Sequence, residues 1–345
     1  MNPMMKILVC AAVLAGCSAT TTSSTSSSSG GSQTPTLVVK AYVQQNLDEL
    51  LAASTALRDA APAPDQDGWN ATADAAAVTS MRTQWKRARV AYERVEGAIA
   101  VLFPELDAST DERYDGFLET GADTNLFDRS GVTGIHGIER ILWAGEHPAR
   151  VVDFESALTG YVAATFPATA EEAQAFRTQL CQALVDDVQS MVDQFGPLAL
   201  EDATAYRGVV GSMEEQLEKV LLAATGEEES RYAQHTLGDM RANLEGGRAV
   251  FAAFRETLLA RTNGAALVAA VEGGFDRVVA AYAPVSGDAL PEVPAGWSAN
   301  PTAQQLDTPY GRIYAVLTRE SDPNAEGALV HEMNEGGDAM GIPTL

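Results

Sequence analysis

Apolar and small residues recur every three or four positions through most of the chain after Pro35. The clearest run alternates spacings of four and three and stops before Pro104; it comprises Met81, Trp85, Ala88, Tyr92, Val95, Ile99 and Leu102. This seam predicts one continuous helix whose aromatic side chains pack in the core. No stretch sustains the period-two alternation of a strand, so the pattern predicts an all-α protein.

Glycine and proline breaks separate the other helical patterns. In chain order these cover about 37–57, 133–143, 152–165, 171–195, 204–224, 227–261, 265–282, 303–318 and 325–334. Gly196-Pro197 is the strongest candidate for a domain boundary. Each side of it offers four or five helices, which predicts two helical-bundle domains, residues 35–196 and 197–345.

The chain begins with the pattern of an export signal. A short basic start precedes the apolar run Ile7–Leu14, which is too short to span a bilayer as a helix. The run ends in Leu14-Ala15-Gly16-Cys17, which resembles a bacterial lipobox. We therefore expect residues 1–16 to be a signal peptide and Cys17 to be lipidated; an ordinary secretory signal with an incidental cysteine is the alternative.

The segment 17–34 has almost nothing to bury. Thirteen of the seventeen residues from Ser18 to Thr34 are Ser or Thr, which predicts a disordered tether. By the lipoprotein sorting pattern that the leader resembles, Ser18 after the cysteine favours the outer membrane. We expect a domain anchored to the membrane through lipid, on the periplasmic side.

The formal net charge of −24 restricts the partners of the chain. A strongly acidic protein repels nucleic acid and anionic membrane surfaces, so nucleic acid is excluded as a partner. The same field attracts cations, although solubility alone explains many acidic proteins. Cys181 is the one cysteine in the predicted folded part, so no internal disulfide is expected.

The stretch Thr133–Trp143 carries the first candidate chemistry. His136 and Glu139 lie three residues apart in an apolar helical pattern, so both side chains project from one face. An imidazole and a carboxylate at this spacing can share a transition-metal ion, but two ligands do not fill its coordination shell.

Glu93 and Glu96 are one helical turn apart beside the apolar seam. A carboxylate there is costly unless something neutralises it. A metal ion would do so; pairing with Arg89 or Arg94 at the surface is the alternative.

Common catalytic motifs are absent from the sequence. There is no phosphate-binding Gly-x-x-x-x-Gly-Lys-Ser/Thr loop, no Gly-x-Ser-x-Gly elbow and no His-Glu-x-x-His pair. The chain has four histidines in all, whereas a zinc hydrolase needs three protein ligands, a water and a general base. Such a site would require carboxylates from several helices.

Three segments together resemble the imelysin family, which includes periplasmic iron-uptake proteins of the EfeO type. They are Gly134-x-His136-x-x-Glu139, Tyr92–Glu96 and Arg231–Gly246, and the resemblance covers nearly all of the chain after Pro35. It implies two helical bundles, a metal site near their interface and a role in iron uptake, with an iron-transport permease or receptor as a partner.

The resemblance also implies ligands. In the iron-uptake branch, the positions matched by Glu93, Glu96 and Asp111 contribute to metal binding, and Asp107 is the alternative to Asp111. A further carboxylate is expected from the second bundle, for which Glu214, Glu215 and Glu218 remain open. The sequence departs from this branch at Gln234, where a histidine is usual, and it shows no segment that resembles the cupredoxin-like domain of some members.

The combined prediction is a metal site formed by His136, Glu139, Glu93, Glu96 and Asp111. Hard carboxylates with one imidazole suit iron, with zinc or copper as alternatives. We expect a protein of iron acquisition that captures and hands over its ion without catalysis. A metallopeptidase of the imelysin type is the second hypothesis, and a scaffold that binds a partner or a polysaccharide is the third.

Overall fold

The computed structural model describes residues 34–65, 67–112, 123 and 125–345. Within these residues all regular structure is helical and no strand occurs, which confirms the predicted all-α class. None of the described helices combines the length and apolar composition needed to cross a bilayer. The predicted signal peptide, the tether up to Gln33 and the lipidation site Cys17 lie outside the described residues.

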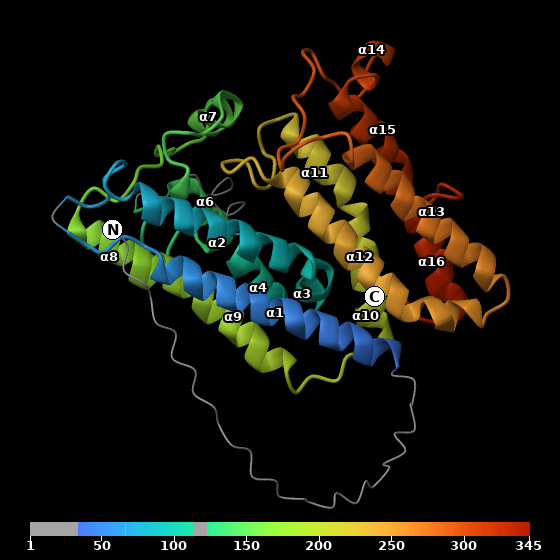
Figure 1. Cartoon of the computed structure of the whole chain (residues 1–345). Coiled ribbons are helices and arrows are strands. Elements are labelled where there is room, and N and C mark those ends of the chain that lie inside the picture. Colours follow the sequence, from blue (N-terminus) through green and yellow to red (C-terminus); the bar gives the residue numbers. More distant parts are fainter. Residues whose placement is uncertain (1–33, 66, 113–122, 124) are drawn as a thin grey trace, which may run out of the picture. The chain divides into compact units, whose positions relative to one another are not determined.

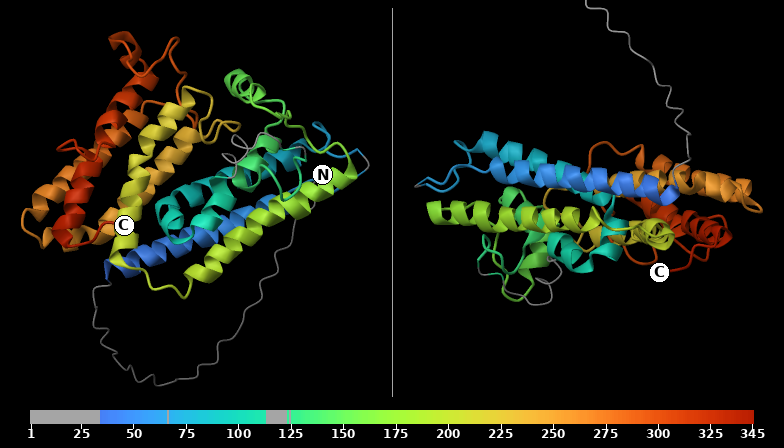
Figure 2. Two further views of the ribbon diagram at one scale, coloured as in Figure 1. Left: turned by 180° about the vertical axis from the view of Figure 1, so that it is seen from behind. Right: turned by 90° about the horizontal axis from the view of Figure 1, so that it is seen from below.

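The first helices of the chain pack side by side (Figure 1, blue to green). Helix α1 (Pro35–Asp59) lies against α2 (Ala75–Glu93) and α9 (Gln182–Phe195). The views from behind and from below show α1 and α9 alongside each other (Figure 2). Proline at the first position of α1 fits its start, because a helix leaves that N–H unbonded in any case.

The later helices form a second group (Figure 1, yellow to red). The group consists of α10 (Asp202–Glu214), α11 (Gln216–Ala223), α12 (Thr236–Leu259), α13 (Gly264–Tyr282), α14 (Ala303–Leu306), α15 (Pro309–Glu320) and α16 (Leu329–Met340). Helix α13 packs on α12, α15 and α16. Helices α10 and α12 also contact α1, so buried apolar side chains of both groups form one continuous cluster. The division into two domains at Gly196-Pro197 stays a prediction.

The predicted helix over 81–102 is wrong in one respect, because the structure breaks it. Helix α2 ends at Glu93, and α3 (Glu96–Leu102) begins after two intervening residues. The side-chain amide of Asn243 donates a hydrogen bond to the backbone oxygen of Glu93 over 2.8 Å. An outside donor thus satisfies a carbonyl at the end of α2. The aromatics of the seam are buried as predicted, Trp85 and Tyr92 included.

Two other predicted helices are shorter than expected. Helix α7 (Ala149–Ser156) ends well before residue 165, and Gly160 takes a left-handed φ of 82° in the irregular segment that follows. The helix expected from Glu227 begins only at Thr236, as α12. The residues from Glu227 up to Thr236 form turns instead of a helix, and Gln234 takes a left-handed φ of 52°. Because Glu139 accepts hydrogen bonds from backbone N–H groups of these turns, a tertiary contact replaces local helix formation.

Helices α3 and α10 cross so closely that only glycine fits at the crossing. A Cβ atom on Gly97 would lie 2.5 Å from the backbone oxygen of Gly208. Because both residues lack side chains, the backbones meet and Glu96 is brought toward the second group of helices. The close approach therefore helps to position a candidate ligand.

We expect Gly97→Ala to lower the free energy of unfolding by about 1–3 kcal/mol, because the added methyl group overpacks this crossing. Gly211→Ala is the matched control, since no atom lies within 4 Å of the position that its methyl group would take on α10. There the change should raise stability by about 0.5–1 kcal/mol through helix propensity. Urea denaturation of both variants measures the difference; equal effects would show that the crossing is not tightly packed.

Candidate metal-binding site

The helix that carries His136 starts against the turn that carries Asp111. Helix α6 (Gly134–Leu142) follows extended Thr133, and Gly134 has a left-handed φ of 73°. A Cβ atom at Gly134 would lie 2.4 Å from the backbone oxygen of Thr110, in the π-helical turn η1 (Ala108–Glu112). The glycine of the motif therefore meets a steric need: it lets α6 begin in contact with η1.

The buried seam of α2 holds α6 from the other side. The indole N–H of Trp85 donates a hydrogen bond to the backbone oxygen of Ile135 over 2.8 Å. With α6 fixed between α2 and η1, His136 Nε2 lies 3.1 Å from Asp111 Oδ1. Apolar packing thus sets the distance between the two polar groups.

Glu139 lies behind the imidazole of His136. Its Oε2 is 2.6 Å from His136 Nδ1, and its Oε1 accepts hydrogen bonds from the backbone N–H groups of Tyr232 and Ala233 at 2.9 and 2.7 Å. The carboxylate is completely buried. A carboxylate on Nδ1 fixes the orientation of the ring and leaves Nε2 to face the site. The predicted pair does share a helix face, but Glu139 contacts the ring rather than the centre that Nε2 faces.

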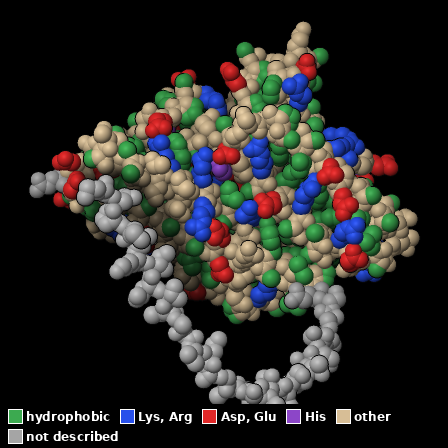
Figure 3. Space-filling model, in the orientation of Figure 1, with side chains coloured by type: hydrophobic (Ala, Val, Ile, Leu, Met, Phe, Trp, Pro, Cys, Tyr) green, Lys and Arg blue, Asp and Glu red, His purple; other side chains and the backbone are tan. Residues whose placement is uncertain are grey.

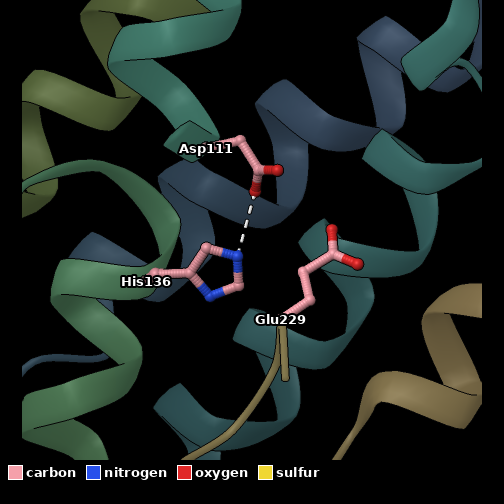
Figure 4. Close-up of side chains that lie close together, drawn as sticks. All are labelled: Asp111, His136 and Glu229. Atoms are coloured by element: carbon pink, nitrogen blue, oxygen red, sulfur yellow. Dashed lines mark ion pairs between the residues drawn. The ribbon is translucent and has the colours of Figure 1, made fainter. Parts of the chain in front are cut away.

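Three side chains bring potential ligand atoms together. Asp111, His136 and Glu229 each offer one such atom, and these atoms lie within 4.8 Å of one another (Figure 4). Glu229 comes from the turns between α11 and α12, in the second half of the chain. The sequence had left Glu214, Glu215 and Glu218 open for this role. The run of glutamates at positions 227–229, directly after Gly226, is the signal that could have identified Glu229.

Glu93 and Glu96 lie next to this trio and pair with cationic side chains of the protein. Glu93 is in ion-pair contact with Arg89, one turn earlier on α2. Both glutamates approach Lys219 of α11, whose Nζ lies 3.3 Å from Glu93 and 3.4 Å from Glu96. Asn243 also donates a hydrogen bond of 2.8 Å to Glu96. The break between α2 and α3 turns both carboxylates toward the second half of the chain.

Arg89 lies at the middle of the acidic groups. Its guanidinium is fully buried, and its four carboxylate partners are Asp111, Glu93, Glu229 and Asp239. The sequence allowed Arg89 to pair with a glutamate, but at the surface. A delocalised guanidinium with five N–H donors suits this role, because several carboxylates can bind it at once.

We define the carboxylate cluster as Glu93, Glu96, Asp111, Glu139, Glu229 and Asp239. In the described part of the chain, the ion pairs of these six carboxyl groups are with Arg89 and Lys219, which are permanently charged, and with His136 and His235. Buried Arg231 lines a cavity beside the cluster. Burial raises the pKa of Glu93 and of Glu96, and the nearby Glu229 carboxylate adds to the rise. Among the described residues, the six carboxyl groups of the cluster thus outnumber the four cationic side chains that pair with them.

The cluster shifts the titration of its members in opposite directions. Burial alone would lower the pKa of His136, but the adjacent Asp111 outweighs it and, with Glu139, raises the pKa to about 9. Burial alone would raise the pKa of Asp111, yet Arg89 and His136 hold it at about 2. At neutral pH the two therefore form a charged pair in which a proton on His136 takes the place of a cation.

A cavity of about 250 Å³ borders the cluster. Asp111, His136 and Glu229 line it together with Glu96, Lys219 and Asp107. Asp107 accepts a hydrogen bond from the Tyr92 hydroxyl group, so the alternative to Asp111 lies on the same cavity. Glu215 and Glu218 line it as well, whereas Arg89 and Glu139 do not. Acidic and basic side chains are interspersed over the face drawn in Figure 3, so neither sign dominates it.

The fold and this site define a family. The family model described as Imelysin matches residues 39–315, and the chain belongs to the imelysin family. Among curated proteins, the iron uptake system component EfeO of Escherichia coli K12 is 26% identical over 239 residues. The EfeO proteins of Shigella flexneri and of E. coli O157:H7 match to the same extent. Each alignment covers 69% of this chain and 50% of the relative, so the chain spans about half the length of the curated relatives it matches.

We expect Arg89→Met to destabilise the protein by about 3–5 kcal/mol, because it leaves several buried carboxylates without their shared cation. Arg87→Met is the control on the same helix: Arg87 pairs with Glu49, and both side chains are more than a third exposed. Its loss should cost less than about 1 kcal/mol. Urea unfolding at pH 7 compares the two; similar losses would contradict a central role for Arg89.

Proposed function

We propose that the chain binds a metal ion, iron in the first place, as a protein of iron uptake. Asp111, His136 and Glu229 would hold the ion as cargo, and Glu96 and Asp107 on the same cavity could complete its shell. The observation that carries the proposal is the convergence of these three side chains, from both halves of the chain, beside an excess of carboxyl groups. The names of the relatives, iron uptake components, support the choice of cargo.

The site fits a cation by a test independent of the family. His136 Nε2 and Glu229 Oε2 are buried atoms without a hydrogen bond of good geometry, although each lies within ion-pair distance of a charged group. Such atoms cost free energy unless a ligand satisfies them. Carboxylate oxygens with one imidazole nitrogen suit iron, zinc or copper(II), whereas copper(I) prefers sulfur ligands.

The geometry favours binding over peptide hydrolysis. A metallopeptidase needs a general base next to a metal-bound water. Glu139, the glutamate of the motif, is completely buried, does not line the cavity and already accepts hydrogen bonds on both oxygens. It therefore serves as an orienting group for His136. The metallopeptidase remains the second candidate through the family to which the chain belongs.

The cellular setting is part of the same proposal. We place the chain on the periplasmic side of the outer membrane, anchored through lipid on Cys17, which lies outside the described residues. There it would pass its ion to an iron-transport permease or receptor. The relatives named as iron uptake components support this setting, and the export pattern at the start of the sequence agrees with it.

Titration of the purified chain with ferrous, ferric, zinc and cupric ions tests the proposal. We expect one equivalent of ferrous or ferric ion to bind most tightly, and His136→Ala and Glu229→Gln each to weaken binding by roughly tenfold or more, since each removes a ligand. Glu256→Gln, at a carboxylate with a side chain 83% exposed, should bind as the wild type does.

A parallel assay separates binding from hydrolysis. Unfolded protein is incubated with the metal-loaded chain, with and without chelator. Chelator-sensitive cleavage that disappears in Glu139→Gln would contradict the binding function and favour the metallopeptidase. Unchanged metal binding in both His136→Ala and Glu229→Gln would instead rule out this site.

The pH dependence of binding follows from the pKa of His136. Because that pKa is raised to about 9, the ring carries a proton at pH 7 that a metal ion must displace. Affinity for a divalent ion should therefore rise between pH 6 and 8 by up to about one logarithmic unit per pH unit. Calorimetry in two buffers of different ionisation enthalpy should detect about one released proton at pH 7. Release of no proton would contradict the role of His136.

A further inference from the structure

Lys219 places an ammonium group inside the proposed cation site. Its Nζ lies 2.5 Å from Glu229, 3.3 Å from Glu93 and 3.4 Å from Glu96, and its side chain is only 7% exposed. Glu229 is also one of the three side chains that converge with His136. A metal ion and the ammonium group of Lys219 therefore compete for the same carboxylate.

We propose that Lys219 is a displaceable counter-ion, which occupies the carboxylates of the site in the metal-free protein and moves aside when a metal ion binds. The inference rests on the proposed function. It assigns to Lys219 the role of limiting metal affinity, so that a captured ion can be released again. An ion whose binding does not offset the displacement of the ammonium group would be rejected.

Lys219 can move, whereas Arg89 cannot. Arg89 is fully enclosed, holds four carboxylates and does not line the cavity. Lys219 lines the cavity of about 250 Å³, so its flexible four-carbon stem has open space beside it. A lysine ammonium is a compact point charge without the fixed planar geometry of a guanidinium. Arg89 therefore stays bound to its carboxylates, whereas Lys219 can be displaced from its carboxylates by a metal ion.

Glu215 offers the displaced ammonium group a second position. It lies four residues before Lys219, one helical turn away, and both side chains line the same cavity. Within the described part of the chain Glu215 makes no ion pair. Loss of hydration and the nearby Glu96 raise the pKa of Glu215 to about 8, and Lys219 acts against this rise, so the two side chains already interact. Lys219 can therefore exchange Glu229 for Glu215 without leaving the protein.

The exchange predicts opposite effects of one substitution on affinity and on stability. Lys219→Met removes the competitor, so metal affinity should rise by roughly tenfold or more. The metal-free protein should be less stable, because Glu93, Glu96 and Glu229 lose a cation. A saturating metal ion should then raise the unfolding temperature of the variant more than that of the wild type. A merely structural lysine would instead lower stability and affinity together.

The experiment compares the full chain in four forms: wild type, Lys219→Met, Lys219→Arg and Glu215→Gln. Ferrous ion under anaerobic conditions and zinc ion are the probes, with affinity from calorimetry and unfolding temperature from circular dichroism. Lys219→Arg keeps the charge and should bind no more tightly than the wild type. Glu215→Gln removes the second position and should weaken metal binding. Lys219→Gln replaces Lys219→Met if the latter does not fold.

The outcomes distinguish this inference from the function on which it rests. Tighter binding by Lys219→Met than by wild type supports the inference, and binding by the variant alone supports it most strongly. If the wild type binds an ion and the folded variant binds equally or more weakly, the inference is overturned while the proposed function stands. If neither form binds any of the probe ions, both fall.

Discussion

The neutralisation of buried carboxylates is the constraint on which the rest of this structure depends. Six carboxyl groups gather where the two halves of the sequence meet, and Arg89 and Lys219 are their permanently charged partners. Arg89 comes from α2 and Lys219 from α11, so neither half could form the cluster alone. A buried charge without a partner would cost several kcal/mol, on the order of the stability of a whole domain. The contact between the halves therefore contributes to the stability of the fold.

This constraint explains the irregular places in an otherwise regular helical fold. The break between Glu93 and Glu96 gives up part of a helix, but it turns two carboxylates toward Lys219, and Asn243 satisfies the released carbonyl. The segment before α12 forms turns instead of a longer helix, and these turns carry Glu229. Gly134 starts α6 in a left-handed conformation so that His136 reaches Asp111. Each irregularity therefore brings at least one polar side chain to the cluster.

The sequence was sufficient for the regular parts of the fold and for some members of the carboxylate cluster. Helical spacing predicted α1, α13 and the buried seam of Trp85 and Tyr92, because apolar periodicity directly reflects burial. It could not predict the break after Glu93, since the apolar pattern continues across it. Glu229 was missed because the segment around it has helical periodicity, whereas contacts with distant residues, Glu139 and Arg150 among them, hold the segment in turns. The central position of Arg89 could not be predicted from the sequence. Its four carboxylate partners come from separate segments of the chain, and the structure of some of these segments was not predicted.

Two glutamates of the carboxylate cluster, Glu139 and Glu229, differ in their access to the cavity. Glu139 is saturated by hydrogen bonds and has no access to the cavity, so it can only fix the ring of His136. Glu229 faces the cavity and is held by cations that a bound metal ion would have to displace. A site with internal cations offers a weaker hold than bare carboxylates would, because part of the binding free energy goes into displacing them. Under the proposed function, that loss would be a disadvantage for a resident catalytic metal and an advantage for a cargo that must leave again.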